Sequence, residues 1–354
     1  MRASELRKME GELRAYIESF VDGMGRPERR RAMGWYITGL LLDGERKSIE
    51  PMAARLVDDA AEAQAMRQRL QECVVRSGWS DDEARARLAR KLDREMPGIE
   101  AFVIDDTGFP KKGEYSVGVQ RQYSGTLGRR DNCQIAPSLH LAGEAGSGCV
   151  ALRLYLPEVW AEDAKRRRTA GVPEDIVFLR KWEIALKQLD DAIEWGVRKH
   201  VVLADAGYGD CTEFRDGLTE RRFSYVLGIS GTHLVWPPGS NPRPPVRKPG
   251  QGGKAPTKYV AGRHEPVAIS ELIKDIPRTA YKKVAWREGT RGRQSSRFLA
   301  LRVQLATHHH YGKVTPAQRK RLDRELGPLL EYVTGGIGRP ERRRALGGDA
   351  FCGR

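Results

Sequence analysis

The sequence predicts a mixed α/β sheet that follows a helical region, and three features of the chain predict it. Residues 4–96 repeat their apolar positions every three or four residues, which is the period of an amphipathic helix. Between residues 101 and 156 the period changes to two and β-branched and aromatic residues dominate, which is typical of strands. After residue 175, helical segments alternate with short apolar runs, which indicates strands joined through helices.

The helical region shows four segments with their own start and stop signals. Apolar residues from Leu6 to Phe20 form one stripe, and further helices are expected over 31–42, 49–76 and 81–96. Ser80 precedes the last of these helices with Glu83 three residues later, which is the spacing of a capping box. Pro97-Gly98 then ends the helical pattern, so we predict a helical region over residues 1–97.

Strand signals follow in a regular order. Gly-rich turns separate the first four, so we expect consecutive antiparallel strands at 101–104, 114–123, 133–141 and 150–156. Helices at 175–195 and 211–220 lead into strands at 201–204 and 225–229. Residues 236–262 are basic and rich in Pro and Gly, which predicts a loop, and 281–287 with 297–303 predict a hairpin.

The composition favours an acidic partner. Lys and Arg number 62 against 47 Asp and Glu, a formal net charge of +15, so nucleic acid is the first partner to consider. The sequence contains no apolar run of about 18 residues and no apolar signal core near Met1, which argues against a membrane partner. Its five cysteines form no CxxC pair, which argues against a zinc ribbon or a disulfide framework. We therefore expect a cytoplasmic protein, associated with the nucleoid when it binds DNA.

An internal repeat marks the C-terminal segment. GRPERRRAMG at Gly25–Gly34 recurs as GRPERRRALG at Gly338–Gly347, with nine of ten residues identical. The same register pairs Glu12 with Glu325 and Glu18 with Glu331. We interpret residues 304–354 as an aberrant segment that duplicates the N-terminal helix and its turn.

Acidic residues directly follow two of the apolar runs. Asp105 and Asp106 come after Val103-Ile104 as a turn is expected to begin, and Asp205 comes after the run 201–204. Carboxylates at strand ends are held by a rigid sheet, and Mg²⁺ prefers oxygen ligands of this kind. As an alternative, the three aspartates serve only as turn formers or helix caps. Two such positions in one sheet of a basic chain favour a metal site that acts on a phosphate.

These runs belong to a longer set of motifs that carries a resemblance. The motifs are Ile104-Asp-Asp-Thr-Gly-Phe-Pro-Lys-Lys-Gly113, Ser116-Val-Gly-Val119, Arg121-Gln-Tyr123, Arg153-Leu-Tyr-Leu-Pro157, Ala170-Gly-Val-Pro173 and Leu203-Ala-Asp-Ala-Gly-Tyr-Gly209. Together they resemble the DDE transposases of bacterial insertion sequences, in the cut-and-paste branch. The resemblance runs from about residue 33 to about residue 303.

The resemblance implies a ribonuclease-H-like catalytic core over 98–229 with a β-rich insertion over 230–303. In such cores the first Asp lies on the first strand, the second on the fourth strand, and a Glu on a later helix. Carried over to this sequence, Asp106 and Asp205 are the catalytic acids and the ligands of Mg²⁺ or Mn²⁺, with Asp105 as the less favoured choice for the first acid. The implied partners are double-stranded DNA, both transposon ends and target, and a second copy of the chain in a homodimer on DNA.

The sequence departs from the family at the third acid. The helical motif of Tyr, two residues, Arg, three residues, Glu, six residues and Lys has no match after Val303. We interpret Glu325 and Glu331 as solvent-facing positions of the copied helix. The expectation is a degenerate transposase, weak or inactive in strand transfer. The alternative is a DNA-binding protein without activity; a hydrolase of small phosphate esters leaves the positive charge without a purpose.

Basic residues cluster beside the first acidic motif. Lys111, Lys112, Arg121, Arg129 and Arg130 are expected to contact phosphates that flank the scissile bond. The alternative for each is an ordinary solvated surface position. Further clusters lie at 26–31, on the predicted N-terminal DNA-binding region, and at 243–258. The three histidines at 308–310 are expected in a surface turn, and Trp236 and Trp286 in packing.

Overall fold

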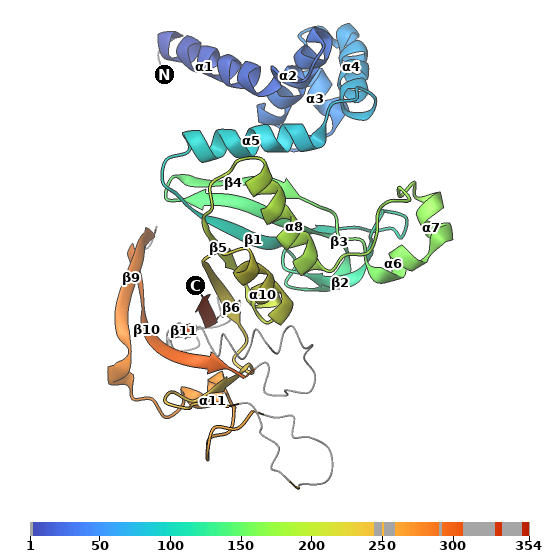
Figure 1. The fold of residues 1–354 in the computed structure, drawn as a ribbon. Coiled ribbons are helices and arrows are strands. Elements are labelled where there is room, and N and C mark those ends of the chain that lie inside the picture. Colours follow the sequence, from blue (N-terminus) through green and yellow to red (C-terminus); the bar gives the residue numbers. More distant parts are fainter. Residues whose placement is uncertain are drawn as a thin grey trace. The chain divides into compact units, whose positions relative to one another are not determined.

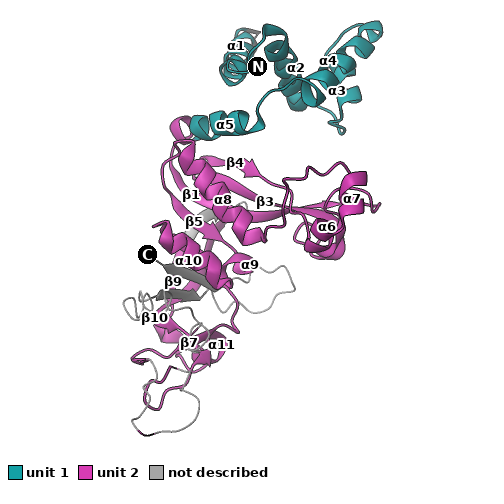
Figure 2. Cartoon of the chain, turned by 45° about the vertical axis from the view of Figure 1, so that its right-hand side comes forward, with its two compact units in different colours: residues 1–92 teal, residues 93–354 magenta. Residues whose placement is uncertain are grey.

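A computed structural model describes residues 3–243, 250, 259–289, 292–306, 330–334 and 349–353. The chain forms two compact units, Met1–Leu92 and Asp93–Arg354 (Figure 2). No helix in the described ranges is long and apolar enough to cross a membrane. The predicted boundaries at 97, 229 and 303 remain predictions.

The first unit is helical. Its α-helices are α1 (Ala3–Val21), α2 (Pro27–Leu41), α3 (Ile49–Arg55), α4 (Ala63–Val75) and α5 (Asp81–Glu95), of which the last three residues, from Asp93, belong to the second unit. Pro27 opens α2, where its missing N–H costs no hydrogen bond. The predicted cap of α5 is confirmed, because the Glu83 amide donates to Ser80 Oγ at 3.1 Å. The apolar stripe of α1 packs through Ile17 and Val21 against Met33.

One long helix over 49–76 was expected, and this is wrong. The chain leaves the helix after Arg55 and makes a short 3₁₀ turn at Ala60–Glu62 before α4 begins. Asp59 Oδ1 accepts a hydrogen bond from the Ala61 amide at 2.8 Å. An aspartate that caps a new turn in this way competes with continuation of the preceding helix.

The second unit is built on a mixed sheet (Figure 1). Its central strands are β1 (Ile99–Pro110), β2 (Gln120–Ser124), β3 (Arg129–Gly143), β4 (Gly146–Leu152), β5 (Val201–Ala204) and β6 (Tyr225–Ile229). Strand β1 pairs antiparallel with β3 and parallel with β5, which pairs parallel with β6. Strands β2 and β4 both pair with β3. This order of parallel and antiparallel strands confirms the predicted α/β fold class.

Helices α8 (Lys181–Glu194) and α10 (Thr212–Glu220) pack on each other and lie on one face of this sheet (Figure 1). On β1, Phe102 and Ile104 are fully buried. From α8, the Gln188 side chain donates to the carbonyl of Pro137 on β3 at 2.9 Å. Alternate β1 residues therefore face α8, and the residues between them face the opposite side.

Two predicted elements begin later than expected. The helix expected from residue 175 begins at Lys181, where the Arg180 amide donates to Glu183 Oε2 at 2.6 Å. Of the strand expected over 114–123, only the part from Gln120 is extended and paired. The segment between β4 and α8 holds two short helices, α6 (Glu158–Glu162) and α7 (Ala164–Thr169).

The rest of the second unit extends the sheet. It contains α9 (Ala206–Gly209), β7 (Leu234–Trp236), β8 (Val267–Ala268), α11 (Ile269–Leu272), a 3₁₀ turn (Arg278–Ala280), β9 (Lys282–Gly289), β10 (Gly292–Leu305), β11 (Leu330–Thr334) and β12 (Asp349–Gly353). The predicted hairpin is confirmed, because β9 pairs antiparallel with β10.

The prediction that the C-terminal segment forms a second copy of the N-terminal helix is wrong for residues 330–334. These residues form β11, which pairs with β10 and β12, whereas their counterparts 17–21 belong to α1. Pairing with neighbouring strands therefore decides the local structure over the copied helical pattern. The remaining copied residues, including 338–347, lie outside the described residues.

Candidate active site

The two adjacent aspartates lie within a strand. A turn was expected to begin at Asp105-Asp106, and this is wrong, because β1 continues to Pro110. Its pairing with β3 is unbroken from Ala101 to Pro110, with Asp105 opposite Ser138 and Asp106 opposite Pro137. Since neighbouring side chains of a strand alternate, the two carboxylates lie on opposite faces of the sheet.

Asp105 is the aspartate that lies beside Asp205. The parallel register of β1 and β5 ends with Ile104 opposite Ala204, and the next residues along the two strands are Asp105 and Asp205. Both are exposed. Asp205 leaves β5 as the N-cap of α9, and its Oδ1 accepts a hydrogen bond from the Gly207 amide at 3.0 Å. Asp205 therefore acts as a helix cap at the end of the strand.

Asp106 faces α8 and has partners on both oxygens. The Lys181 ammonium lies 2.5 Å from Oδ2, and the Tyr208 hydroxyl donates to Oδ1 at 2.8 Å. Lys181 also lies over the ring of Tyr155, with 5.7 Å from Nζ to the ring centroid. This carboxylate is thus neutralised by a cation and tied to both α8 and α9.

The pKa values of the site reflect this uneven distribution of charge. Burial raises the pKa of Asp205, and the negative charges of Asp105 and then Asp106 raise it further, while the Gly207 amide opposes the shift. Burial and the charge of Asp106 raise the pKa of Tyr208 far above its usual range. Asp205 is therefore a carboxylate whose ionised form is disfavoured until a cation arrives.

The start of α9 depends on two glycines. A side chain at Gly209 would overlap the Gly228 carbonyl oxygen, because a Cβ there would lie 1.8 Å from it. At Gly228 a Cβ would lie 2.8 Å from the Ala206 amide nitrogen. Close approach of α9 to β6 therefore holds Asp205 at the sheet edge. This packing accounts for the glycine at position 209 without a phosphate loop.

No third acidic residue joins Asp105 and Asp205 in the part of the chain that the structure describes. No group of three or more His, Cys, Asp or Glu side chains is gathered for a metal ion in that part. Glu331 was interpreted as a helical position, and this is wrong, because it lies on β11 opposite Arg302 of β10. Glu325 and the histidines at 308–310 lie outside the described residues.

The donor chemistry of the two adjacent carboxylates fits a hard divalent cation. Asp105 and Asp205 offer oxygen donors, which Mg²⁺ and Mn²⁺ prefer. The pKa of Asp205 is raised mainly by burial and further by the charges of Asp105 and Asp106, and a bound cation would favour its ionised form. Asp106 fits less well, because both of its oxygens already have partners.

The five predicted phosphate-binding residues are exposed, and they lie on different faces. Lys111 and Lys112 follow β1, Arg121 lies on β2, and Arg129 and Arg130 begin β3. Arg130 is opposite Tyr123 in the β2–β3 register, so its neighbour Arg129 points to the other face. There Arg129 forms an ion pair with Asp131 at 2.8 Å. The structure thus separates Arg129 from Arg121 and Arg130.

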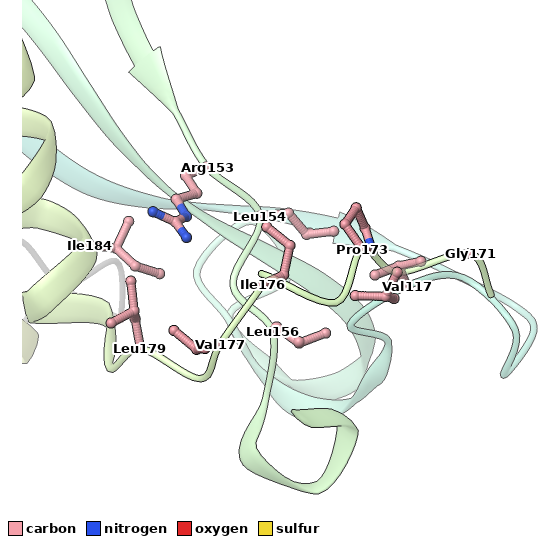
Figure 3. Close-up of a pocket in the computed structure, with 11 residues that line it drawn as sticks. Val117, Arg153, Leu154, Leu156, Gly171, Pro173, Ile176, Val177, Leu179 and Ile184 are labelled. Carbon is pink, nitrogen blue, oxygen red and sulfur yellow. The ribbon is translucent and has the colours of Figure 1, made fainter. Parts of the chain in front are cut away.

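A pocket of about 260 Å³ is lined by residues between Val117 and Ile184 (Figure 3). Its lining is apolar apart from one guanidinium, and consists of Val117, Arg153, Leu154, Leu156, Gly171, Val172, Pro173, Ile176, Val177, Leu179 and Ile184. None of the three candidate aspartates lines it. Trp236 is buried, as expected, and the side chain of Trp286 lies outside what the structure describes.

Sequence reasoning missed Lys181 and Tyr208. The position of Tyr208 three residues after Asp205 at a helix start was a usable signal, since such residues return toward the same strand edge. Lys181 gave no signal, because its contact with Asp106 spans 75 positions and depends on how α8 packs.

Comparison with known proteins gives two matches. The family model described as DDE superfamily endonuclease matches residues 19–293. A protein of Microchaete diplosiphon, named "Probable transposase for insertion sequence element IS701", is 26% identical over 199 residues, which cover 56% of this chain and 48% of that protein. The chain thus matches about half the length of this relative.

Proposed function

Because the chain belongs to the DDE superfamily of endonucleases, we propose that it is the transposase of an insertion sequence, cutting and joining DNA at the carboxylates of Asp105 and Asp205. The observation that carries the assignment is the register of β1 and β5, which brings these two residues to adjacent strand ends. The family match and the transposase relative favour the enzyme over a DNA-binding protein without activity.

Asp105 replaces Asp106 as the proposed first acid. Asp105 and Asp205 share a strand edge and are exposed, whereas Asp106 faces α8 and is bound to Lys181 and Tyr208. The Lys181 ammonium already balances the charge of Asp106 and would repel a metal cation there. Asp106 is instead proposed to act as a positioning residue, since its bond to Tyr208 ties α9, and with it Asp205, to β1.

Endonucleases of this superfamily are metal-dependent. Asp105 and Asp205 are the residues proposed to hold Mg²⁺ or Mn²⁺, which when bound stabilises the charge that develops on the attacking and leaving oxygens of an in-line displacement. In strand cleavage, a water oxygen forms a bond to phosphorus as the bond to the 3′-oxygen breaks; the proton lost by water goes to solvent, and the leaving oxygen ends as a 3′-hydroxyl. In strand transfer that 3′-hydroxyl oxygen forms a bond to phosphorus of a target phosphodiester as the bond to the target's 3′-oxygen breaks; the hydroxyl proton goes to solvent, and the target is left with a free 3′-hydroxyl.

The partner is proposed to be double-stranded DNA, at the element's ends and at the target, with two copies of the chain acting as a homodimer. The net charge of +15 supports a polyanionic partner. For the chain in a cell this predicts a cytoplasmic protein associated with the nucleoid.

The test is metal-dependent cleavage of DNA that carries the element's ends, with three single substitutions compared. Asp105→Asn and Asp205→Asn are expected to abolish cleavage and to weaken Mn²⁺ binding in a direct titration. Asp106→Asn is expected to retain Mn²⁺ binding and to lose cleavage only in part. If Asp106→Asn alone abolished Mn²⁺ binding, while Asp105→Asn left it intact, the assignment of the first acid would be overturned.

A further inference from the structure

One face of the β2–β3 hairpin carries exposed cations and an exposed aromatic ring together. In the hairpin register, Arg121 lies opposite Asn132 and Tyr123 opposite Arg130. Alternation places Arg121, Tyr123 and Arg130 on one face, because Gln122 and Ser124, which alternate with Arg121 and Tyr123 along β2, are buried on the other face. Tyr123 keeps 61% of its surface exposed between the two arginines.

The segment that follows β1 adds to the same face. The Lys111 amide donates to the Asn132 carbonyl at 3.0 Å, and the Asn132 side chain donates to the carbonyls of Lys111 and Gly113 at 2.9 and 3.0 Å. These bonds hold the start of the segment against β3 beside the hairpin face. The segment therefore brings the Lys111 cation to this face.

This surface lies on the same face of the sheet as Asp105. Asp105 is opposite Ser138 on β3, and every second residue from Ser138 leads to Asn132 and Arg130. Asp105 and Lys111 are both on β1 or its direct continuation, six positions apart, which is about 20 Å at about 3.3 Å per residue. That length corresponds to about six nucleotides of one strand at about 3.4 Å each.

We propose that this surface, made of Lys111, Arg121, Tyr123 and Arg130, binds a DNA strand about six nucleotides from the bond that is cut, and that Tyr123 stacks on an unpaired base of that strand. The proposal rests on the proposed function and specifies how its substrate is held. The cations match the charge of the phosphates, and an exposed tyrosine between them offers the flat face on which a base stacks. A paired base is already stacked on both sides, so the surface is selective for DNA that is single-stranded or opened there.

The binding test uses the full chain in EDTA, so that it is independent of cleavage. The probes are a twenty-nucleotide oligothymidylate and a duplex of the same length, each labelled for fluorescence anisotropy. Tyr123→Leu is expected to weaken oligothymidylate binding roughly 5- to 100-fold and duplex binding much less, while Tyr123→Phe keeps the stacking and the affinity. Equal affinities of Tyr123→Leu and the parent chain for oligothymidylate would overturn the stacking assignment.

The charges of the surface have a matched control on the same hairpin. Arg121→Ala and Arg130→Ala are each expected to lower the slope of log affinity against log salt by about one, whereas Arg129→Ala, on the opposite face, leaves it unchanged. If Arg129→Ala had the same effect as Arg121→Ala, the assigned face would be wrong.

Photocrosslinking gives a positional readout that other DNA-binding regions of the chain do not alter. Oligonucleotides with 5-iodouracil at successive positions are irradiated with the chain, and the crosslinked peptide is identified by mass spectrometry. The crosslink is expected on Tyr123, and crosslinks confined to other peptides would overturn the proposal. Because Asp205→Asn leaves this surface intact, a crosslink that persists in the variant while cleavage is lost separates failure of the surface from failure of the catalytic assignment.

Discussion

Replacing Asp205 by Asn is predicted to stabilise the protein while it removes a ligand of the proposed metal site. Asparagine retains the cap on α9, because its side-chain oxygen also accepts the hydrogen bond from the Gly207 amide. What the substitution removes is the negative charge that Asp105 and burial disfavour. The free energy of unfolding at pH 7 should therefore rise in the variant.

The magnitude follows from the strand geometry. Neighbouring strands are about 4.8 Å apart. Two unit charges about 5 Å apart repel by about 0.8 kcal/mol in water and by about 3 kcal/mol at an effective dielectric constant of 20. Asp105 and Asp205 are exposed, so the lower figure applies and the expected gain is about 1 kcal/mol. In a unit of this size that gain raises the melting temperature by about 2–4 °C.

The pH dependence of the gain has a definite sign. The pKa of Asp205 is raised in the folded chain, so protonated Asp205 favours folding. This contribution is fully present below the unfolded pKa of about 3.9 and is lost as the pH rises through the folded pKa. The advantage of Asp205→Asn should therefore vanish at low pH and appear as the pH rises.

Scanning calorimetry in EDTA and in millimolar MgCl₂ measures both effects. We expect Mg²⁺ to raise the melting temperature of the parent chain and to leave that of Asp205→Asn unchanged. The matched control is Asp106→Asn, for which the sign is opposite: it leaves Lys181 unpaired and should cost about 1–3 kcal/mol. The reasoning fails if Asp205→Asn melts below the parent in EDTA, or if Mg²⁺ still raises its melting temperature.

Three further predictions concern hydrogen bonds and packing within the second unit. Tyr208→Phe should lower the free energy of unfolding by about 1.5–3 kcal/mol in urea denaturation, because it removes a hydrogen bond to a carboxylate, and the control Tyr155→Phe should cost less. The raised pKa of Tyr208 gives a contribution to stability that is present below pH about 10 and lost above it. The stability of Tyr208→Phe should therefore also be less sensitive to alkali. Asp93 is buried, and its bonds to Arg198 and His200 outweigh the effect of burial and lower its pKa. Asp93→Asn should therefore lower the free energy of unfolding by about 1–3 kcal/mol at pH 7, and by progressively less as the pH falls below about 3.9. A loss of stability that is independent of pH would contradict this. Gly209→Ala should lower the melting temperature by an overpacking cost of at least about 2 kcal/mol, whereas Gly113→Ala, with open space at its Cβ, should have little effect; equal melting temperatures would refute the close-approach argument.

The sequence predicted the sheet because its strand and helix signals are strong and local. The apolar runs at 201–204 and 225–229 became β5 and β6 with the predicted bounds, and the cap at Ser80 formed as its spacing required. The errors concern places where distant pairing decides. Residues 330–334 carry a copied helical pattern and still form a strand, because β10 and β12 supply partners.

The choice between Asp105 and Asp106 needed the structure for a physical reason. In the run Ala101-Phe-Val-Ile104 both faces of the strand are apolar, so the sequence shows no alternation that would assign a face to either aspartate. Only the packing of α8, with Lys181 at its start, distinguishes the two faces. The resemblance located the dipeptide, but a resemblance to a motif does not contain the direction of a side chain.

The charge of the proposed site bears on how many metal ions it would hold before DNA arrives. Lys181 cancels the charge of Asp106, so the described carboxylates available to an ion are Asp105 and Asp205, and their two negative charges balance one divalent cation. A second cation needs another anion, and a DNA phosphate supplies it. We therefore expect Mn²⁺ titration of the free chain to give one ion per chain, and two in the presence of DNA. Two ions bound without DNA would mean that a further acid from the C-terminal segment completes the site. Glu325→Gln would then be the first substitution to test.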